Sequence, residues 1–420
     1  MRRIRGVGLG EAMASSIIDW QAWCHRKVES LNLMEGDRAR RRVSLDCTPQ
    51  DIGWPVYDWP KWWAHRRDAQ IAVPLTMMSK GLIRDLDVSD SEGRPISVLG
   101  RSENVAIAEL TMWAMVKKSV IPGLEQEVRA ILSDIAGMES KRAQAKAEGL
   151  IVMLKLSDSV ANRILDFAAN FLLVALLPRE KANQRQLIKY SYHWERESPG
   201  TIRSALRGLV AGLGFISYKS VMEIAFAQSA RSYHLEVPAP DGLLVTKIRL
   251  GKGSDGLLKP SRPSVVGHAQ ANYSKLDDGT DDAEIFIRLA RRSILPPVAG
   301  AALLVWLGFS WALIAPNALS SMRSSADAAT ALLLVGPALM IGWLARNGEN
   351  AITSRLLGPT RFIAGSLSLL LVSVGLGLVF RMPELALYRL LTLGSIASFA
   401  VGVVLTAGSL TTWIRSNRQL

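Results

Sequence analysis

The last third of the chain contains four long apolar runs. They cover residues 294–315, 328–345, 362–380 and 390–410. Each run has about the 20 residues that a helix needs to cross the hydrocarbon core of a bilayer. We therefore expect a multidomain membrane protein with a C-terminal bundle of four transmembrane helices over residues 294–414, followed by a short cytoplasmic tail at 415–420.

Arginines flank these runs unevenly. One set of span ends carries Arg288, Arg291, Arg292, Arg346, Arg355, Arg361, Arg415 and Arg418, and the opposite set carries Arg323, Arg381 and Arg389. Because basic residues are retained on the cytoplasmic side, this bias predicts that both the preceding domain and the C-terminus are cytoplasmic. Arginine greatly outnumbers lysine and alanine is plentiful. We therefore expect a bacterial inner membrane protein with several spans.

The interiors of the four runs contain no ionisable residue near their middles. Ion-coupled carriers and voltage sensors need such groups at depth, so a conventional secondary transporter is disfavoured. Small residues follow one helix face instead: Gly365, Ser373 and Gly377 in the third run, and Gly394, Ser398, Gly402 and Thr406 in the fourth. Such stripes allow close helix packing, either within one four-helix bundle or between subunits of a homo-oligomer.

The formal net charge of the chain is +13. Residues 294–420 have eight arginines and three acids, which leaves +8 for the preceding region. A basic domain tethered to a membrane fits the anionic inner leaflet, whereas no nucleic-acid-binding module supports a nucleic-acid partner. Arg38, Arg40, Arg41 and Arg42 form a basic cluster. This cluster is either a solvated loop or a membrane-surface site for anionic lipid headgroups.

Residues 1–118 are expected to form a Trp-rich α/β region. The first 50 residues look irregular, and Cys24 and Cys47 are expected to stay reduced in the cytoplasm. Residues 54–63 form an aromatic strap that either packs on its own domain or docks a partner or the bilayer surface. Strands are predicted at 68–78 and within 87–99, around a turn at 90–93, followed by a helix at 102–118.

Residues 119–186 are expected to be helical. Apolar residues from 124 to 138 follow the spacing of one helix face, and a second helix is expected over 150–177. The apolar run at 167–177 is too short to cross a bilayer, so we interpret it as part of a buried helix.

Residues 187–293 contain alternating or β-branched runs separated by Pro, Gly and Asp, which predicts an antiparallel β-sandwich-like domain. One amphipathic helix interrupts it after Thr201, with an apolar stripe opposite Arg203 and Arg207. This helix either covers one side of the sheet or lies on the membrane surface.

Two similar segments lie in this domain, at residues 191–195 and 232–236. In strands, each would place its histidine and glutamate on one face. If the two strands were neighbours, His193, Glu195, His234 and Glu236 could bind zinc, although two solvated strand faces explain the same residues. No catalytic motif for a nucleophile or a zinc protease is found, and no cofactor is expected.

The sequence therefore favours a membrane-anchored cytoplasmic binding, sensing or scaffold protein rather than an enzyme. Its partners would be the lipid bilayer and a cytoplasmic protein or ligand. The alternative is an oligomeric pore-forming or membrane-disrupting effector, gated by the cytoplasmic domain.

Overall fold

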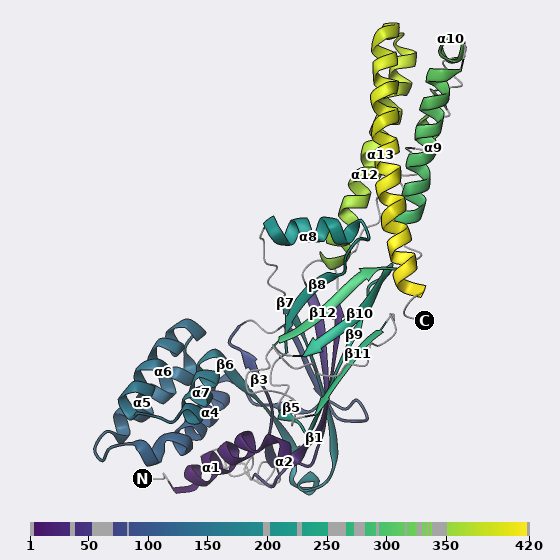
Figure 1. The fold of residues 1–420 in the computed structure, drawn as a ribbon. Coiled ribbons are helices and arrows are strands. Elements are labelled where there is room, and N and C mark those ends of the chain that lie inside the picture. Colours follow the sequence, from purple (N-terminus) through teal and green to yellow (C-terminus); the bar gives the residue numbers. More distant parts are fainter. Residues whose placement is uncertain are drawn as a thin grey trace.

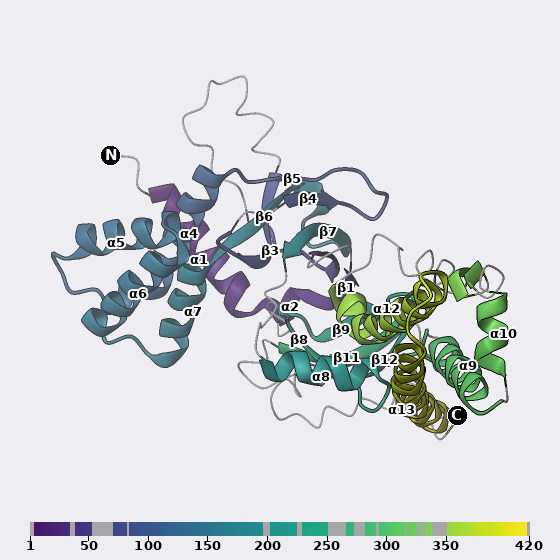
Figure 2. The ribbon, with the colours of Figure 1, turned by 90° about the horizontal axis from the view of Figure 1, so that it is seen from above.

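The computed structural model describes residues 4–33, 38–52, 70–81, 84–195, 202–224, 229–250, 266–272, 282–290, 294–315, 317–325 and 351–417, with several positions between 330 and 337. A helical lobe lies at one end of the molecule and three long apolar helices at the other, with β-sheets between them (Figures 1 and 2). The chain thus combines a mixed α/β N-terminal region with apolar helices at its C-terminus.

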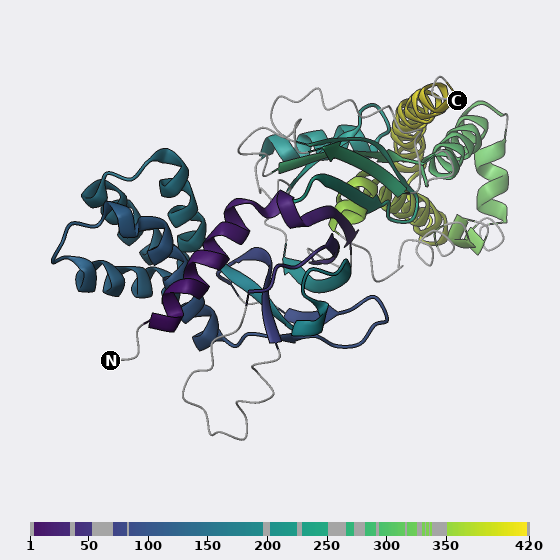
Figure 3. The same cartoon turned by 90° about the horizontal axis from the view of Figure 1, so that it is seen from below.

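The helical lobe contains α4 (Arg101–Val116), α5 (Glu125–Gly137), α6 (Ser140–Leu154) and α7 (Asp158–Ala169), with a short 3-10 turn at Lys117–Ser119. In α5, Val128, Leu132 and Ile135 are buried at the spacing of one helix face, as the sequence predicts. The N-terminal helix α1 (Ile4–Ile18) packs on α4 and leads through α2 (Trp20–Trp23) toward the sheets (Figure 3).

The largest sheet has six strands in the order β11-β9-β1-β2-β7-β4. Their bounds are β11 (Val266–Asn272), β9 (Ser232–Pro238), β1 (Cys24–Leu33), β2 (Arg38–Cys47), β7 (Gln186–Glu195) and β4 (Arg84–Ser89). All neighbours are antiparallel except β1 and β9, which are parallel. The sheet therefore joins N-terminal strands to strands about 200 residues further along the chain.

Two three-stranded sheets complete this part. One has the order β10-β12-β8 and comprises β10 (Leu243–Leu250), β12 (Asp282–Leu289) and β8 (Tyr218–Glu223). The other has the order β3-β6-β5 and comprises β3 (Gln70–Ser79), β6 (Asn170–Pro178) and β5 (Ser97–Val98), with a 3-10 turn at Arg179–Lys181 after β6. The first lies next to the long helices and the second next to the helical lobe (Figure 1).

The long helices are α9 (Leu295–Ile314), α12 (Ala351–Val379) and α13 (Glu384–Asn417), with a short α10 (Ala318–Ser324) after α9. All three are long and apolar enough to cross a membrane. Large apolar side chains such as Leu304, Phe362 and Leu393 are exposed on their outer faces, as expected for helices surrounded by lipid. Much of the predicted span at 328–345 lies outside the described residues, so four spans are not confirmed.

Hydrophobic cores link these parts. One core joins the helical lobe to β3, β6 and part of the six-stranded sheet. A second joins β8, β9, β10 and β12 to the near ends of the three long helices, and includes Leu289, Leu295, Leu356 and Leu405. A third, smaller core holds the far ends of those helices together. The second core makes the sheet and the base of the bundle one packed unit.

Three predictions about the N-terminal region are wrong or incomplete. The first 50 residues contain α1, α2, β1 and β2 instead of irregular structure. The single helix expected over 150–177 is divided: α6 ends at Leu154, and α7 runs from Asp158 to Ala169. Asn170 Nδ2 donates a 3.1 Å hydrogen bond to Asp166 O, and the following apolar run is the strand β6. β6 lies between β3 and β5 and is buried on both faces, so its apolar pattern is continuous and resembles that of a buried helix.

The antiparallel sandwich predicted over 187–293 is not confirmed. Its strands divide between two sheets, and β7 and β9 pair with the N-terminal strands β2 and β1. The aromatic strap at 54–63 lies outside the described residues. The predicted strand at 68–78 corresponds to β3, and the helix at 102–118 to α4.

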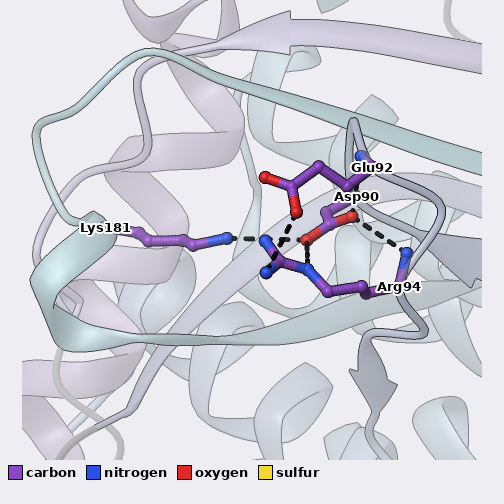
Figure 4. A network of polar contacts seen from close by, with 4 residues as sticks. All are labelled: Asp90, Glu92, Arg94 and Lys181. Atoms are coloured by element: carbon purple, nitrogen blue, oxygen red, sulfur yellow. Dashed lines mark hydrogen bonds and ion pairs between the residues drawn. The ribbon is translucent and has the colours of Figure 1, made fainter.

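The predicted turn at 90–93 is also found. The Asp90 carboxylate accepts hydrogen bonds from the backbone N–H groups of Glu92 and Arg94. The Arg94 guanidinium forms ion pairs with the carboxylates of Asp90 and Glu92 (Figure 4). Lys181 Nζ lies 3.8 Å from Asp90 and comes from the turn after β6. The cluster ties the turn to the neighbouring sheet and is explained by this structural role.

Candidate functional site at the base of the helix bundle

The helix α8 (Ile202–Gly212) lies beside the base of α12, next to the sheet that contains β8 and β12 (Figure 1). It packs on α12, β8 and β12. Gly208, Ala211 and Gly212 form its buried face. The helix predicted from the stripe after Thr201 is confirmed.

We call the contact of α8 and the residues just after it with α12 and α13 the joint. Glycines allow the backbones to approach closely there. A Cβ atom on Gly212 would overlap the carbonyl oxygen of Leu356 in α12. A Cβ atom on Gly408, in α13, would overlap the carbonyl oxygen of Leu213, the residue after α8. Side chains at these positions would therefore force α8 away from the long helices.

Four hydrogen bonds connect the sheet side of the joint to the long helices. Arg355 Nη1 donates to Tyr218 Oη at 2.9 Å, Thr360 Oγ1 to Gly212 O at 3.2 Å, Thr411 Oγ1 to Gly214 O at 3.0 Å, and Arg415 Nη1 to Phe215 O at 2.6 Å. Three of these bonds are accepted by backbone carbonyls at the end of α8 or just after it. Carbonyls at a helix end have no partner within the helix, so these bonds satisfy them. The joint is therefore held by both apolar packing and directed bonds.

The opposite face of α8 is apolar and exposed. Leu206, Leu209 and Val210 are 58%, 45% and 37% exposed, and they lie at the i, i+3, i+4 spacing of one helix face. Arg207 is exposed beside them. An amphipathic helix at the end of membrane-spanning helices has the arrangement expected of an interfacial helix.

The predicted small-residue stripe on the fourth span packs within the chain. A Cβ atom on Gly394 would lie 2.9 Å from Phe309, and one on Gly402 would lie 2.7 Å from Leu303, both in α9. Ser398 is fully buried between them, and Thr406 donates a 2.7 Å hydrogen bond to Gly402 O in its own helix. These contacts correspond to packing within one bundle.

The small-residue stripe predicted on the third span makes fewer contacts with other helices among the described residues. Gly377 faces Met382 and Leu387 at the turn between α12 and α13. A Cβ atom on Gly365 would meet nothing within 4 Å among the described residues. Ser373 bonds only to its own helix, at Leu369 O, among the contacts of the described residues.

The basic cluster of residues 38–42 lies in β2 and not in a loop. Arg41 is 4% exposed, and its Nε lies 2.9 Å from Glu29 Oε1, so a membrane-surface role for Arg41 is wrong. Arg40 is half-buried and donates a 3.1 Å hydrogen bond to Ser191 Oγ. Arg42 is exposed, and Arg38 pairs in register with Glu195 at the strand end.

Arg41 belongs to a buried ionic cluster that the sequence analysis missed. Tyr233 Oη donates a 3.0 Å hydrogen bond to Glu29 Oε2, and Lys27, which is 1% exposed, lies over the Tyr233 ring. Burial lowers the pKa of Lys27, whereas for Arg41 burial is outweighed by Glu29 and neighbouring tyrosines, which raise its pKa. The Arg41 guanidinium and the Lys27 side chain thus lie buried near one carboxylate, that of Glu29, inside the six-stranded sheet.

The proposed zinc site is contradicted by the strand order. β7 carries His193 and β9 carries His234, but β1 and β2 separate these strands. His193 Nδ1 lies 2.6 Å from Asp85 Oδ2, while His234 lies beside His268, with 3.5 Å between Nδ1 and Nε2. His268 also lies 3.8 Å from Glu236. Within the described ranges no group of three or more His, Cys, Asp or Glu side chains could hold a metal ion.

Cys24 and Cys47 lie opposite each other in β1 and β2 as buried free thiols. Burial raises the pKa of Cys24 to about 12 and raises that of Cys47 as well. Neither thiol is therefore suited to act as a nucleophile near neutral pH.

No protein-family model matches the chain, and no curated protein matches it in sequence. The joint around α8 is consequently the candidate site on structural grounds alone. Its close packing was not predictable from Gly208, Gly212 and Gly408 individually; the apolar stripe after Thr201 predicted the helix itself, but that stripe lies on the exposed face of α8.

Proposed function

We propose that this chain is a membrane-anchored protein whose sheet region binds or senses a cytoplasmic partner and passes the resulting change to the transmembrane bundle through α8. The supporting observation is the continuous core that joins β8 and β12 to the near ends of α9, α12 and α13. Elements packed in one close-packed core do not shift independently. A change in the position of β8 or β12 would therefore displace the near ends of the long helices.

We further propose that the bundle has a fourth span within residues 328–345. α9 begins at the base and leads to α10 at the far end, whereas α12 begins again at the base (Figure 1). The chain between α10 and α12 must therefore connect the two ends. Thr330 Oγ1 lies 3.4 Å from Gly375 O, near the far end of α12, which supports this path.

The proposed location is a bacterial inner membrane with both termini in the cytoplasm. Support comes from the arginines at the base of the bundle, such as Arg355 and Arg415, and from their scarcity at the far end. The exposed apolar face of α8 would then lie in the inner leaflet interface.

Coupling can be tested by hydrogen exchange of the full-length protein in nanodiscs of short-chain and long-chain lipids. Bilayer thickness acts on the helices, so coupling predicts altered exchange in β8 and β12 and unchanged exchange in α5 and α6. Tyr218→Phe should weaken the response, and Ser310→Ala, which removes the 2.9 Å Ser310–Ser395 bond inside the bundle, should preserve it. Identical exchange of β8 and β12 in both lipids would refute coupling.

The second candidate, an oligomeric pore, is favoured by Gly365, where a Cβ atom would meet no described residue within 4 Å, and by the position of Ser373 on the same helix. Close packing by a second copy could use this face. Gly365→Leu should then abolish leakage from liposomes that contain the full-length protein. Vesicles that stay sealed with the unaltered protein would exclude an open pore and leave the anchored sensor.

A further inference from the structure

Arg288, in β12, is buried at the base of the bundle, and one nitrogen of its guanidinium lacks a partner among the described residues. Its side chain is 6% exposed, and its Nη2 has no hydrogen-bond acceptor in the part of the chain that the structure describes. A buried guanidinium that lacks an anion is costly, because it loses its hydration without compensation. The arrangement points to a missing anionic ligand.

A second arginine lies nearby. Burial lowers the pKa of Arg288, and the charge of Arg415, in α13, lowers it further. Arg415 is exposed and held in place by its 2.6 Å hydrogen bond to Phe215 O, after α8. Among the described residues no carboxylate forms an ion pair with either arginine. Two guanidinium groups therefore concentrate positive charge at one point of the joint.

The depth of this point relative to the bundle suggests the ligand. The apolar helix α9 has 20 residues and is about 30 Å long, which equals the hydrocarbon core of a bilayer. Gly408 of α13 lies against Leu295, the first residue of α9. Arg415 is two turns further along α13, about 10 Å beyond that level. The headgroup layer extends about 5–8 Å beyond the hydrocarbon core, so the long side chain of Arg415 starts just outside this layer and can reach back to the lipid phosphates.

We propose that Arg288 and Arg415 bind the phosphate group of an anionic phospholipid of the adjoining leaflet, an inference that rests on the proposed membrane anchoring. Guanidinium groups bind phosphate oxygens through paired, charge-assisted hydrogen bonds. The bound phosphate neutralises the buried charge of Arg288 and links β12 to α13. Lipid composition would thereby influence the joint.

The test is native mass spectrometry of the full-length protein in detergent, titrated with phosphatidylglycerol, phosphatidylcholine or inorganic phosphate. The unaltered protein should bind phosphatidylglycerol at least about tenfold more tightly than Arg288→Gln or Arg415→Gln does. Arg249→Gln, which alters an exposed arginine at the other end of the β10-β12 pair, should bind like the unaltered protein. Phosphatidylcholine should bind more weakly.

Thermal unfolding separates binding from a structural role. Without lipid, Arg288→Met should be at least as stable as the unaltered protein, because it removes an uncompensated buried charge. Phosphatidylglycerol should raise the unfolding temperature of the unaltered protein and leave that of Arg288→Met unchanged.

Three results would overturn the proposal. The first is that both glutamine variants bind phosphatidylglycerol as tightly as the unaltered protein, and the second is that phosphatidylcholine binds as tightly as phosphatidylglycerol. The third is that Arg288→Met is less stable than the unaltered protein without lipid. Binding of inorganic phosphate alone would overturn the lipid as its source. Membrane fractionation of the unaltered protein and of each variant tests membrane anchoring separately from the phosphate site. Loss of the unaltered protein from the membrane fraction refutes anchoring, whereas unaltered fractionation with equal lipid binding refutes only the phosphate site.

Discussion

The Arg355 guanidinium of α12 donates a 2.9 Å hydrogen bond to the phenol oxygen of Tyr218, the first residue of β8. Tyr218 is 7% exposed and belongs to the core shared by the sheet and the bundle. This bond connects the long apolar helix α12 directly to β8, the strand next to β12. It lies beside the close contact between Gly208 and Arg355.

Removing the phenol oxygen tests the contribution of this bond. Tyr218→Phe should lower the free energy of unfolding by about 1 kcal/mol, because the half-buried Arg355 loses the phenol oxygen as an acceptor. Tyr388→Phe alters a 50% exposed tyrosine of α13 and serves as the matched control. Thermal unfolding in detergent measures both variants, and equal stability of the two would contradict the expected role of the bond.

Close backbone contact at the joint makes Gly408 sensitive to any side chain. Gly408→Ala should destabilise the protein by about 1–3 kcal/mol, since the added Cβ atom overlaps Leu213 O. Gly300→Ala in α9 is the control, because a Cβ atom there meets nothing within 4 Å among the described residues. It should be neutral or stabilising by up to about 1 kcal/mol. A tolerated Gly408→Ala would show that α8 is packed more loosely against α13.

The buried ionic cluster predicts a strong effect of removing its acid. Glu29→Gln should cost about 3–5 kcal/mol, because Arg41 and Lys27 are left buried without their carboxylate. Glu284→Gln breaks the more exposed pair with Lys219 and should cost about 0–1 kcal/mol. Chemical denaturation compares the two variants. Similar costs would mean that water reaches the Glu29 cluster.

The sequence predicted some of these elements and missed others for identifiable reasons. The stripe of α8 follows from local periodicity and the long apolar helices follow from the length of continuous apolar runs, and the sequence displays both directly. In β2, Ala39, Arg41, Val43, Leu45 and Cys47 alternate inward, and this pattern could have revealed the strand, but the adjacent arginines obscured it. The parallel pairing of β1 with β9 depends on contacts about 200 residues apart, which no local pattern records.

The histidine pair at the edge of the large sheet predicts a pH dependence. Burial, followed by the charges of Arg26 and His268, lowers the pKa of His234 below its usual value of 6.5, while Glu236 opposes the shift. The unfolded chain therefore binds this proton more tightly, so the stability from neutral His234 is present above pH 6.5 and is lost as the pH falls toward the folded pKa. His234→Gln should flatten the slope of unfolding free energy in this window, and an unchanged slope would contradict the assignment.

The two thiols provide a probe of the inner sheet. Both are buried and both have a raised pKa, so a thiol reagent at neutral pH should label Cys24 and Cys47 only as fast as the sheet opens. Labelling should become rapid in denaturant. Fast labelling of the native protein would show that β1 and β2 are accessible.

The central claim is that α8 lies at the surface of a bilayer crossed by the bundle. Spin labels at three exposed positions, placed by Leu206→Cys in α8, Trp311→Cys in α9 and Val152→Cys in the helical lobe, test it most directly in reconstituted full-length protein. Accessibility to oxygen and to a water-soluble nickel complex should place position 311 in hydrocarbon, position 152 in water and position 206 at the interface. A label at 206 that is as water-accessible as the one at 152, or one at 311 in water, would contradict the account.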